Sequence, residues 1–134
     1  MRLLNQEDEV DESTEVTWED QQRINTFSKL NQRFQDAEEL LKKKRTEKEY
    51  LDDVAMELEL VDEDEPVLYK IGETFVHIKL QHAQQLLEKE HKTIDAEVAK
   101  LQSQVDESEN GMKELKVVLY AKFGNAINLE TNPA

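Results

Sequence analysis

The residues of this sequence best suited to chemistry are its three histidines, His77, His82 and His91. Histidine can act as an acid or base near neutral pH and is a common metal ligand. Here no HExxH spacing surrounds them, and the chain has no cysteine to share a metal site. His77 and His82 fall on different predicted elements, and His91 falls on a predicted helix seam. We therefore expect packed or solvated histidines, with no catalytic or metal-binding role.

Carboxylates are the second candidates, because residues 52–65 are strongly acidic and contain no basic residue. An EF-hand would bind Ca²⁺ through ligands that alternate around a central glycine, and this stretch has neither the spacing nor the glycine. Carboxylates on solvated helix faces also lack the burial that tunes a catalytic pKa. No GxSxG motif and no glycine-rich phosphate loop occurs elsewhere. The sequence predicts no enzyme, no catalytic residue, no metal and no cofactor.

Charge and composition limit the partners. The 134 residues carry a net charge of −14, and 36% of them are charged. Affinity for nucleic acid comes largely from lysine and arginine on phosphates, so an RNA-binding helical arm is disfavoured. No apolar run is long enough for a membrane span, and no apolar signal core precedes the acidic start. We expect a cytoplasmic protein, with a nuclear location left open, that binds neither nucleic acid nor membrane.

Two long heptad patterns must position everything else. The first predicted helix covers residues 17–59, with Thr17 as its cap and Asp20 where a capping box would have Glu, which leaves the box imperfect. Lys44 and Lys48 interrupt its seam. The second covers residues 80–124, with His91 and Ser108 as interruptions and Gly124 as a left-handed cap. The seam residues are Phe27, Leu30, Phe34, Ala37, Leu41, Leu51, Ala55 and Leu58, then Leu80, Leu87, Ile94, Val98, Leu101, Val105, Met112, Leu115 and Leu119.

An acidic connector and a single β-hairpin are predicted over residues 60–79. Gly72 and Glu73 suit a type II′ turn, which places Val67 opposite Ile78 and Tyr69 opposite Val76. Because a lone hairpin is marginal in water, we expect it to complete a sheet with other chains. The assembly residues are predicted to be Val67, Tyr69, Ile71, Phe75, Val76 and Ile78, and all of them except Phe75 form one apolar face of the hairpin.

The fold class is therefore mainly α, a long antiparallel two-helix coiled coil joined by one hairpin. We assign residues 1–16 to a disordered acidic tail and residues 17–130 to one domain, with a C-terminal extension over 125–134. Equal helices of about 60 Å bring the start of the first beside the end of the second, far from the hairpin.

Apolar residues gather at that far end on faces that a two-helix coil cannot bury together. An exposed apolar surface on an acidic chain usually marks an interaction site. A local alternative stays open, in which Ala126 to Leu129 folds back and covers Val117, Tyr120 and Phe123. The predicted interaction residues are Trp18, Ile24, Phe27, Val117, Val118, Tyr120 and Phe123.

Three stretches carry a resemblance to a known family. They are Trp18 to Phe27, Tyr69 to Phe75, and Leu119 to Gly124 with Ile127 to Glu130. The sequence resembles the β-type subunits of the prefoldin family. That resemblance implies a heterohexamer of two α-type and four β-type subunits, whose hairpins form β-barrels. It also implies that the coiled-coil tips bind non-native actin and tubulin chains and pass them to the cytosolic chaperonin without ATP. The alternative is a coiled-coil scaffold that oligomerises without binding clients.

Overall fold

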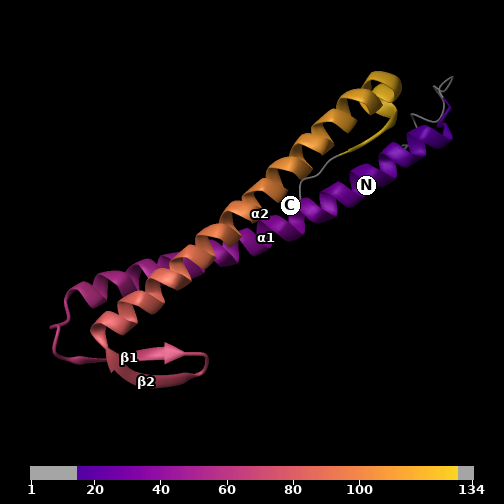
Figure 1. The fold of residues 1–134 in the computed structure, drawn as a ribbon. Coiled ribbons are helices and arrows are strands. Elements are labelled where there is room, and N and C mark those ends of the chain that lie inside the picture. The colour runs from indigo at the N-terminus through magenta and orange to yellow at the C-terminus, as the bar shows by residue number, and fades with distance from the viewer. Residues whose placement is uncertain (1–14, 130–134) are drawn as a thin grey trace. The chain divides into compact units, whose positions relative to one another are not determined.

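The computed structural model describes residues 15–129 as two long helices with a β-hairpin between them (Figure 1). Helix α1 spans Trp18–Glu59, and strands β1 and β2 span Pro66–Ile71 and Thr74–Lys79. Helix α2 spans Leu80–Phe123, and the 3₁₀ turn η2 spans Gly124–Ala126. Each helix boundary lies within one residue of the predicted one. The predictions for residues 1–14 and 130–134 lie outside the described part of the chain.

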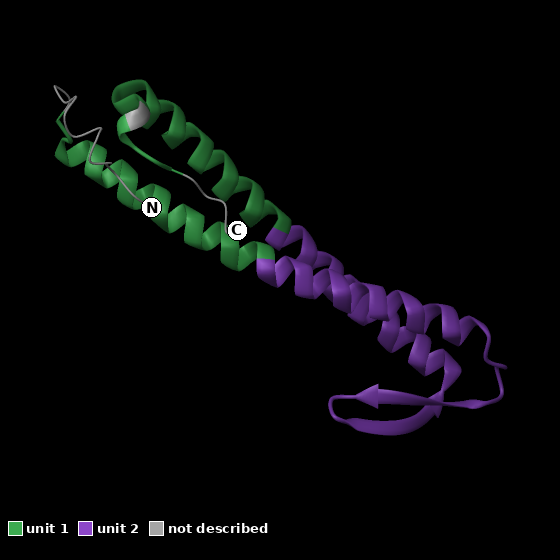
Figure 2. Cartoon of the chain, turned by 180° about the vertical axis from the view of Figure 1, so that it is seen from behind, with its two compact units in different colours: residues 1–38, 102–134 green, residues 39–101 purple. Residues whose placement is uncertain are grey.

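The chain divides into two compact units (Figure 2). Unit 1 combines the start of α1 with the end of α2, within residues 1–38 and 102–134, and unit 2 is residues 39–101. The helices run antiparallel in each. Unit 1 places Asp20 against Lys122 and Leu30 against Gly111, so numbers rise on one helix as they fall on the other. Unit 2 does the same with Lys44 against Glu97 and with Asp52 against His91.

The seam predicted from the heptads forms the core of both units. Every seam residue that the sequence assigned is buried or partly buried. The unit 1 core consists of Ile24, Phe27, Met112, Leu119, Phe123, Ile127 and Leu129. Gly111 leaves room for the Leu30 side chain, because a Cβ at position 111 would lie 2.8 Å from Leu30 Cδ1.

The two lysines that interrupt the seam are paired across the helices of unit 2. Lys44 Nζ lies 3.0 Å from Glu97 and Lys48 Nζ lies 2.8 Å from Asp95. These carboxylates hold the pKa of both lysines above its ordinary value of 10.5. A lysine at a seam position is thus tolerated, because its ammonium group pairs with a carboxylate of the facing helix while its aliphatic stem packs along the seam.

The hairpin has the predicted register. Val67 pairs with Ile78, Tyr69 with Val76, and Ile71 with Thr74. Gly72 has a φ of +64°, the sign that the first central position of a type II′ turn requires.

Part of the apolar hairpin face, which the resemblance implies lines a barrel interior, packs against the helices of its own chain. Tyr69 is buried with Leu58, Leu80, Ala83 and Leu87, and Val67 and Ile78 pack against the same cluster. The chain's own helix ends cover these three residues, whereas Ile71 of the same face is 49% exposed. Ala83 is fully buried although it lies off the seam, because the hairpin adds a third layer there.

The start of α1 corrects a second expectation. Thr17 N–H donates to Asp20 Oδ2 at 3.0 Å, and Asp20 N–H donates to Thr17 Oγ1 at 3.1 Å. These are the two reciprocal bonds of a complete capping box, so the shorter aspartate serves where glutamate was expected. At the other end, Gly124 has a φ of +56° directly after α2, as predicted for a left-handed cap.

Candidate functional site

The predicted interaction residues divide into two groups in the structure. Trp18 and Val117 are each 72% exposed, and Val118 and Tyr120 are exposed at 47% and 38%. We call these four the tip residues. Ile24, Phe27 and Phe123 are instead buried in the unit 1 core. The expectation that all seven form an open surface is thus wrong for these three, because the helices and the C-terminal segment enclose them.

The C-terminal segment Gly124–Leu129 folds back over the core of unit 1. Ile127 and Leu129 are 6% and 0% exposed and belong to the same cluster as Phe123. Leu129 N–H donates to the Tyr120 hydroxyl at 2.9 Å. The local alternative considered from the sequence is therefore right for Phe123 and for the Tyr120 hydroxyl, whereas Val117 stays uncovered. Ile127 and Leu129 were not predicted as site residues, although two apolar residues spaced by two after a capping glycine are a signal for such a segment.

Asp20 joins the two helices at this end of unit 1. Its side chain is 2% exposed and pairs with Arg23 at 3.0 Å and with Lys122 of α2. The hydrogen bond from Lys122, followed by the one from Thr17 N–H, lowers the pKa of Asp20 to about 2. A buried charge is tolerated where it is paired and hydrogen-bonded. This ion pair therefore holds together the two helix ends that carry the tip residues.

The possible chemistry of the histidines is limited by their separate places. His77 and His82 are exposed, and His91 Nε2 lies 3.6 Å from Asp52 Oδ1. Within residues 15–129, no group of three or more His, Cys, Asp or Glu residues could hold a metal ion. The described surface of unit 1 instead offers apolar side chains on a charged background, which suits association with apolar polypeptide.

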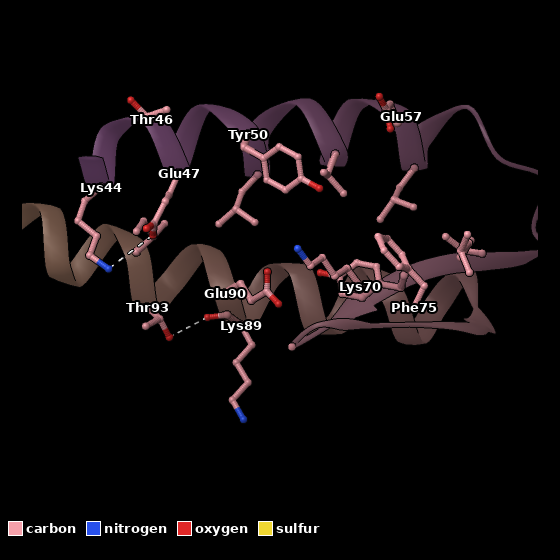
Figure 3. A pocket seen from close by; sticks show the side chains of 18 of the residues that line it. Lys44, Thr46, Glu47, Tyr50, Glu57, Lys70, Phe75, Lys89, Glu90 and Thr93 are labelled. Carbon is pink, nitrogen blue, oxygen red and sulfur yellow. Dashed lines mark hydrogen bonds and ion pairs between the residues drawn. The ribbon is translucent and has the colours of Figure 1, made fainter. Parts of the chain in front are cut away.

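Unit 2 has an open cleft of about 870 Å³ between α1, β1 and α2 (Figure 3). Leu51, Val54, Leu58, Val67 and Tyr69 contribute apolar lining. Figure 3 shows Tyr50 pointing from α1 into this space, with Lys70 and Phe75 of the hairpin across from it.

Tyr69 is the buried titratable residue of the cleft. Burial raises the pKa of its hydroxyl, and the Glu90 carboxylate adds to that shift. The phenol therefore stays neutral at physiological pH, where it packs as part of the core.

The predicted assembly residues differ in exposure. Tyr69 is buried, and Val67, Val76 and Ile78 are half-buried. Ile71 and Phe75 are 49% and 60% exposed, and Leu68, which was not among the predicted residues, is 56% exposed. The apolar side chains that stay exposed therefore lie next to the turn, at Ile71, and along the open cleft, which Leu68 and Phe75 line.

Comparison with known proteins gives a consistent answer. A family model for prefoldin subunits matches residues 21–126. Prefoldin subunit 4 of Saccharomyces cerevisiae is 47% identical over 118 residues, covering 88% of this chain and 92% of that protein. Prefoldin subunit 4 of Homo sapiens is 35% identical over 122 residues, covering 90% and 91% of the two chains.

A solved structure agrees in fold. The prefoldin beta subunit from Thermococcus strain KS-1 matches with a TM-score of 0.73 at 17% identity, covering 83% of this chain and 97% of that one. In the part of the chain that the structure describes, no helix is both long and apolar enough to cross a membrane. The family match over most of the chain, the relatives and the shared fold agree, and the chain belongs to the prefoldin family.

Proposed function

We propose that this prefoldin co-chaperone subunit binds non-native polypeptides through its tip residues and helps transfer them to the cytosolic chaperonin without ATP. The observation that carries the proposal is the 72% exposure of both Trp18 and Val117 beside a complete core. Apolar side chains that gather at one end of an acidic chain with a net charge of −14 usually mark an interaction site. Unfolded polypeptides expose apolar side chains that can cover them.

Weak binding at one tip suits a protein that must release its client. Burial of apolar surface yields about 25 cal/mol per Å², so a few side chains hold a client only loosely. Several tips in one complex would act together on the same client and raise the avidity without tightening any single contact. Release then needs no nucleotide, because each contact opens by itself.

Assembly with other prefoldin subunits follows from family membership. We place that contact at the hairpin, where Leu68, Ile71 and Phe75 are exposed. The proposed complex contains two α-type and four β-type subunits joined through β-barrels. Actin and tubulin are the proposed clients, and the cytoplasm is the proposed location.

The proposal is tested with the triple variant Trp18→Ser, Val117→Ser, Val118→Ser in the reassembled complex. We expect normal assembly by native mass spectrometry, because all three side chains are exposed. We expect a severalfold loss of protection of a denatured protein against aggregation, measured by light scattering. Leu60→Ser is the matched control, since Leu60 is 87% exposed but lies in unit 2.

The second candidate is a scaffold subunit that assembles without touching clients. The exposed hairpin side chains Leu68 and Phe75 favour assembly equally under both functions. Full protection by the triple variant, at normal complex concentration, would assign this chain to the scaffold role.

A further inference from the structure

The C-terminal segment Gly124–Leu129 lies on the core of unit 1, first as the 3₁₀ turn Gly124–Ala126 and then as an extended stretch over residues 127–129. In Figures 1 and 2 the chain turns back after α2 and runs between the two helices. Ile127 has extended backbone angles of φ −131° and ψ 144°. Ile127 and Leu129 are buried while Asn128 between them is exposed. This alternation is that of a strand with one face on an apolar surface.

The surface beneath the segment is apolar and comes from both helices. Ile24 and Phe27 of α1 and Met112, Leu119 and Phe123 of α2 form the cluster that receives Ile127 and Leu129. We call these five the receiving cluster. It belongs to the same unit as the exposed tip residues, and Asp20 with Lys122 fixes the two helix ends together there.

Two of the features that hold the segment do not depend on its particular sequence. The Tyr120 hydroxyl accepts a hydrogen bond from a main-chain amide, that of Leu129, which any residue except proline offers. The two buried side chains contribute apolar area and no polar contact. An extended stretch of any non-native polypeptide with apolar side chains two residues apart presents the same pattern.

We propose that the receiving cluster is a polypeptide-binding site, that Gly124–Leu129 is its resident occupant, and that a client binds by displacing this segment. The proposal rests on the proposed function and adds the substrate class, extended segments with apolar residues at positions i and i+2. It also adds regulation of the same site. The tethered segment competes with the client at an effective concentration of about millimolar for a short link, so it lowers the affinity of each tip for its client.

The sign of one mutational effect separates this proposal from a permanent structural cap. In the full chain within the assembled complex, Ile127→Ser with Leu129→Ser weakens the occupant. We expect the affinity for a fluorescent, permanently unfolded carboxymethylated protein to rise by about tenfold if the native segment is open about a tenth of the time. A permanent cap predicts the opposite, because its loss would damage the cluster. An unchanged or lower affinity overturns the proposal, and Leu60→Ser serves again as the matched control.

A smaller change at the hydrogen bond gives a graded version of that experiment. Tyr120→Phe keeps the ring and removes the acceptor for Leu129 N–H. We expect client affinity to rise about twofold to fivefold, because loss of one ordinary hydrogen bond weakens the closed state by about twofold to tenfold and the segment is open about a tenth of the time. A fall in affinity would show that the hydroxyl serves the client and not the resident segment, contrary to the proposal.

Amide hydrogen exchange on the unaltered chain keeps the proposal falsifiable if the variants fold poorly. We expect the Leu129 amide to lose its protection when the unfolded protein is added, while the capping-box amides of Thr17 and Asp20 keep theirs. A photo-crosslinking residue at Val117 reports separately whether the client reaches this tip. Crosslinking with an unchanged Leu129 amide overturns the displacement and leaves the proposed function standing. Absence of crosslinking overturns the proposed function of this tip, and the displacement with it.

Discussion

Units 1 and 2 are built from the same two helices, yet they complete their cores with different elements. Unit 1 uses its own C-terminal segment, which buries Ile127 and Leu129 against Phe123. Unit 2 uses the hairpin, which buries Tyr69 against Leu58 and Leu80. A two-helix seam offers apolar surface along its flanks at both places. What covers those flanks decides which apolar side chains stay exposed at each end.

The two units also differ in where their charged residues lie. Unit 1 buries one carboxylate, Asp20, between the cations Arg23 and Lys122. Unit 2 spreads its charges along the seam, where Lys44 and Lys48 remain 25% and 42% exposed in their side chains. Exposed pairs contribute little, because solvent screens them. The ion pairs of unit 2 therefore serve mainly to align the two helices. The buried Asp20 instead stabilises the packing of the two helix ends in unit 1.

The largest expected effect comes from Phe27→Ala, which removes a side chain that is 1% exposed in the unit 1 core. Deleting a buried phenylalanine costs about 3–5 kcal/mol. We expect amide exchange to show local opening of unit 1, with the amides of unit 2 still protected. Leu58→Ala makes the reciprocal change in unit 2, where Leu58 is 5% exposed. Equal loss of amide protection in both units from either variant would contradict the expectation that each unit opens separately.

The response to pH is the second way to separate the units. Because the pKa of Asp20 is lowered to about 2, its contribution to stability is complete above its ordinary pKa of 3.8 and is lost as pH falls toward 2. Because the pKa values of Lys44 and Lys48 are raised, their contributions are complete below 10.5 and are lost as pH rises above it.

We therefore expect acid to loosen unit 1 through Asp20, and alkali to loosen unit 2 through its lysines. Amide exchange after brief pH jumps measures both. Asp20→Asn keeps an oxygen that can accept from Thr17 N–H but loses the charge, and it should remove the Asp20 part of the acid response. An acid response of the first turn of α1 that is the same in Asp20→Asn would refute this assignment.

A smaller effect is expected at Gly111, where a residue of low helix propensity makes room for the Leu30 side chain. Gly111→Ala gains about 1 kcal/mol of helix propensity. The new Cβ would lie 2.8 Å from Leu30 Cδ1, so we expect the gain to be largely cancelled. In a Leu30→Ala background the same change should stabilise by the full amount of about 1 kcal/mol. Urea denaturation of the four proteins of this cycle gives the coupling, and a coupling near zero would rule out the steric explanation.

Local patterns in the sequence predicted the elements and much of their pairing. The heptads located the seam, and Gly72 with Glu73 fixed the hairpin register, because both depend on residues near one another in the chain. Two features that the sequence did not predict depend on residues far apart. The hairpin packs on Ala83, and Lys122 completes the environment of Asp20 from the other helix.

The sequence indicated at which helix ends the candidate site lies, but not which of its apolar side chains are exposed. The apolar residues gathered where α2 ends, and Trp18 and Val117 are exposed as expected. Phe123 looked equally available, but it is buried by a segment whose path no periodic pattern describes. Burial on an outer helix face depends on what lies above it, and a helical period carries no information about that third layer.

The sequence by itself determined two heptad helices, one hairpin of defined register, an acidic surface and a cluster of apolar residues at the helix ends. These follow from spacing, turn residues and charge, which act locally along the chain. Only the tertiary structure decided which apolar residues remain in water and which are covered. The C-terminal segment buries Phe123 in unit 1 and the helices bury Tyr69 in unit 2, because apolar surface is covered by whatever segment the fold brings within reach.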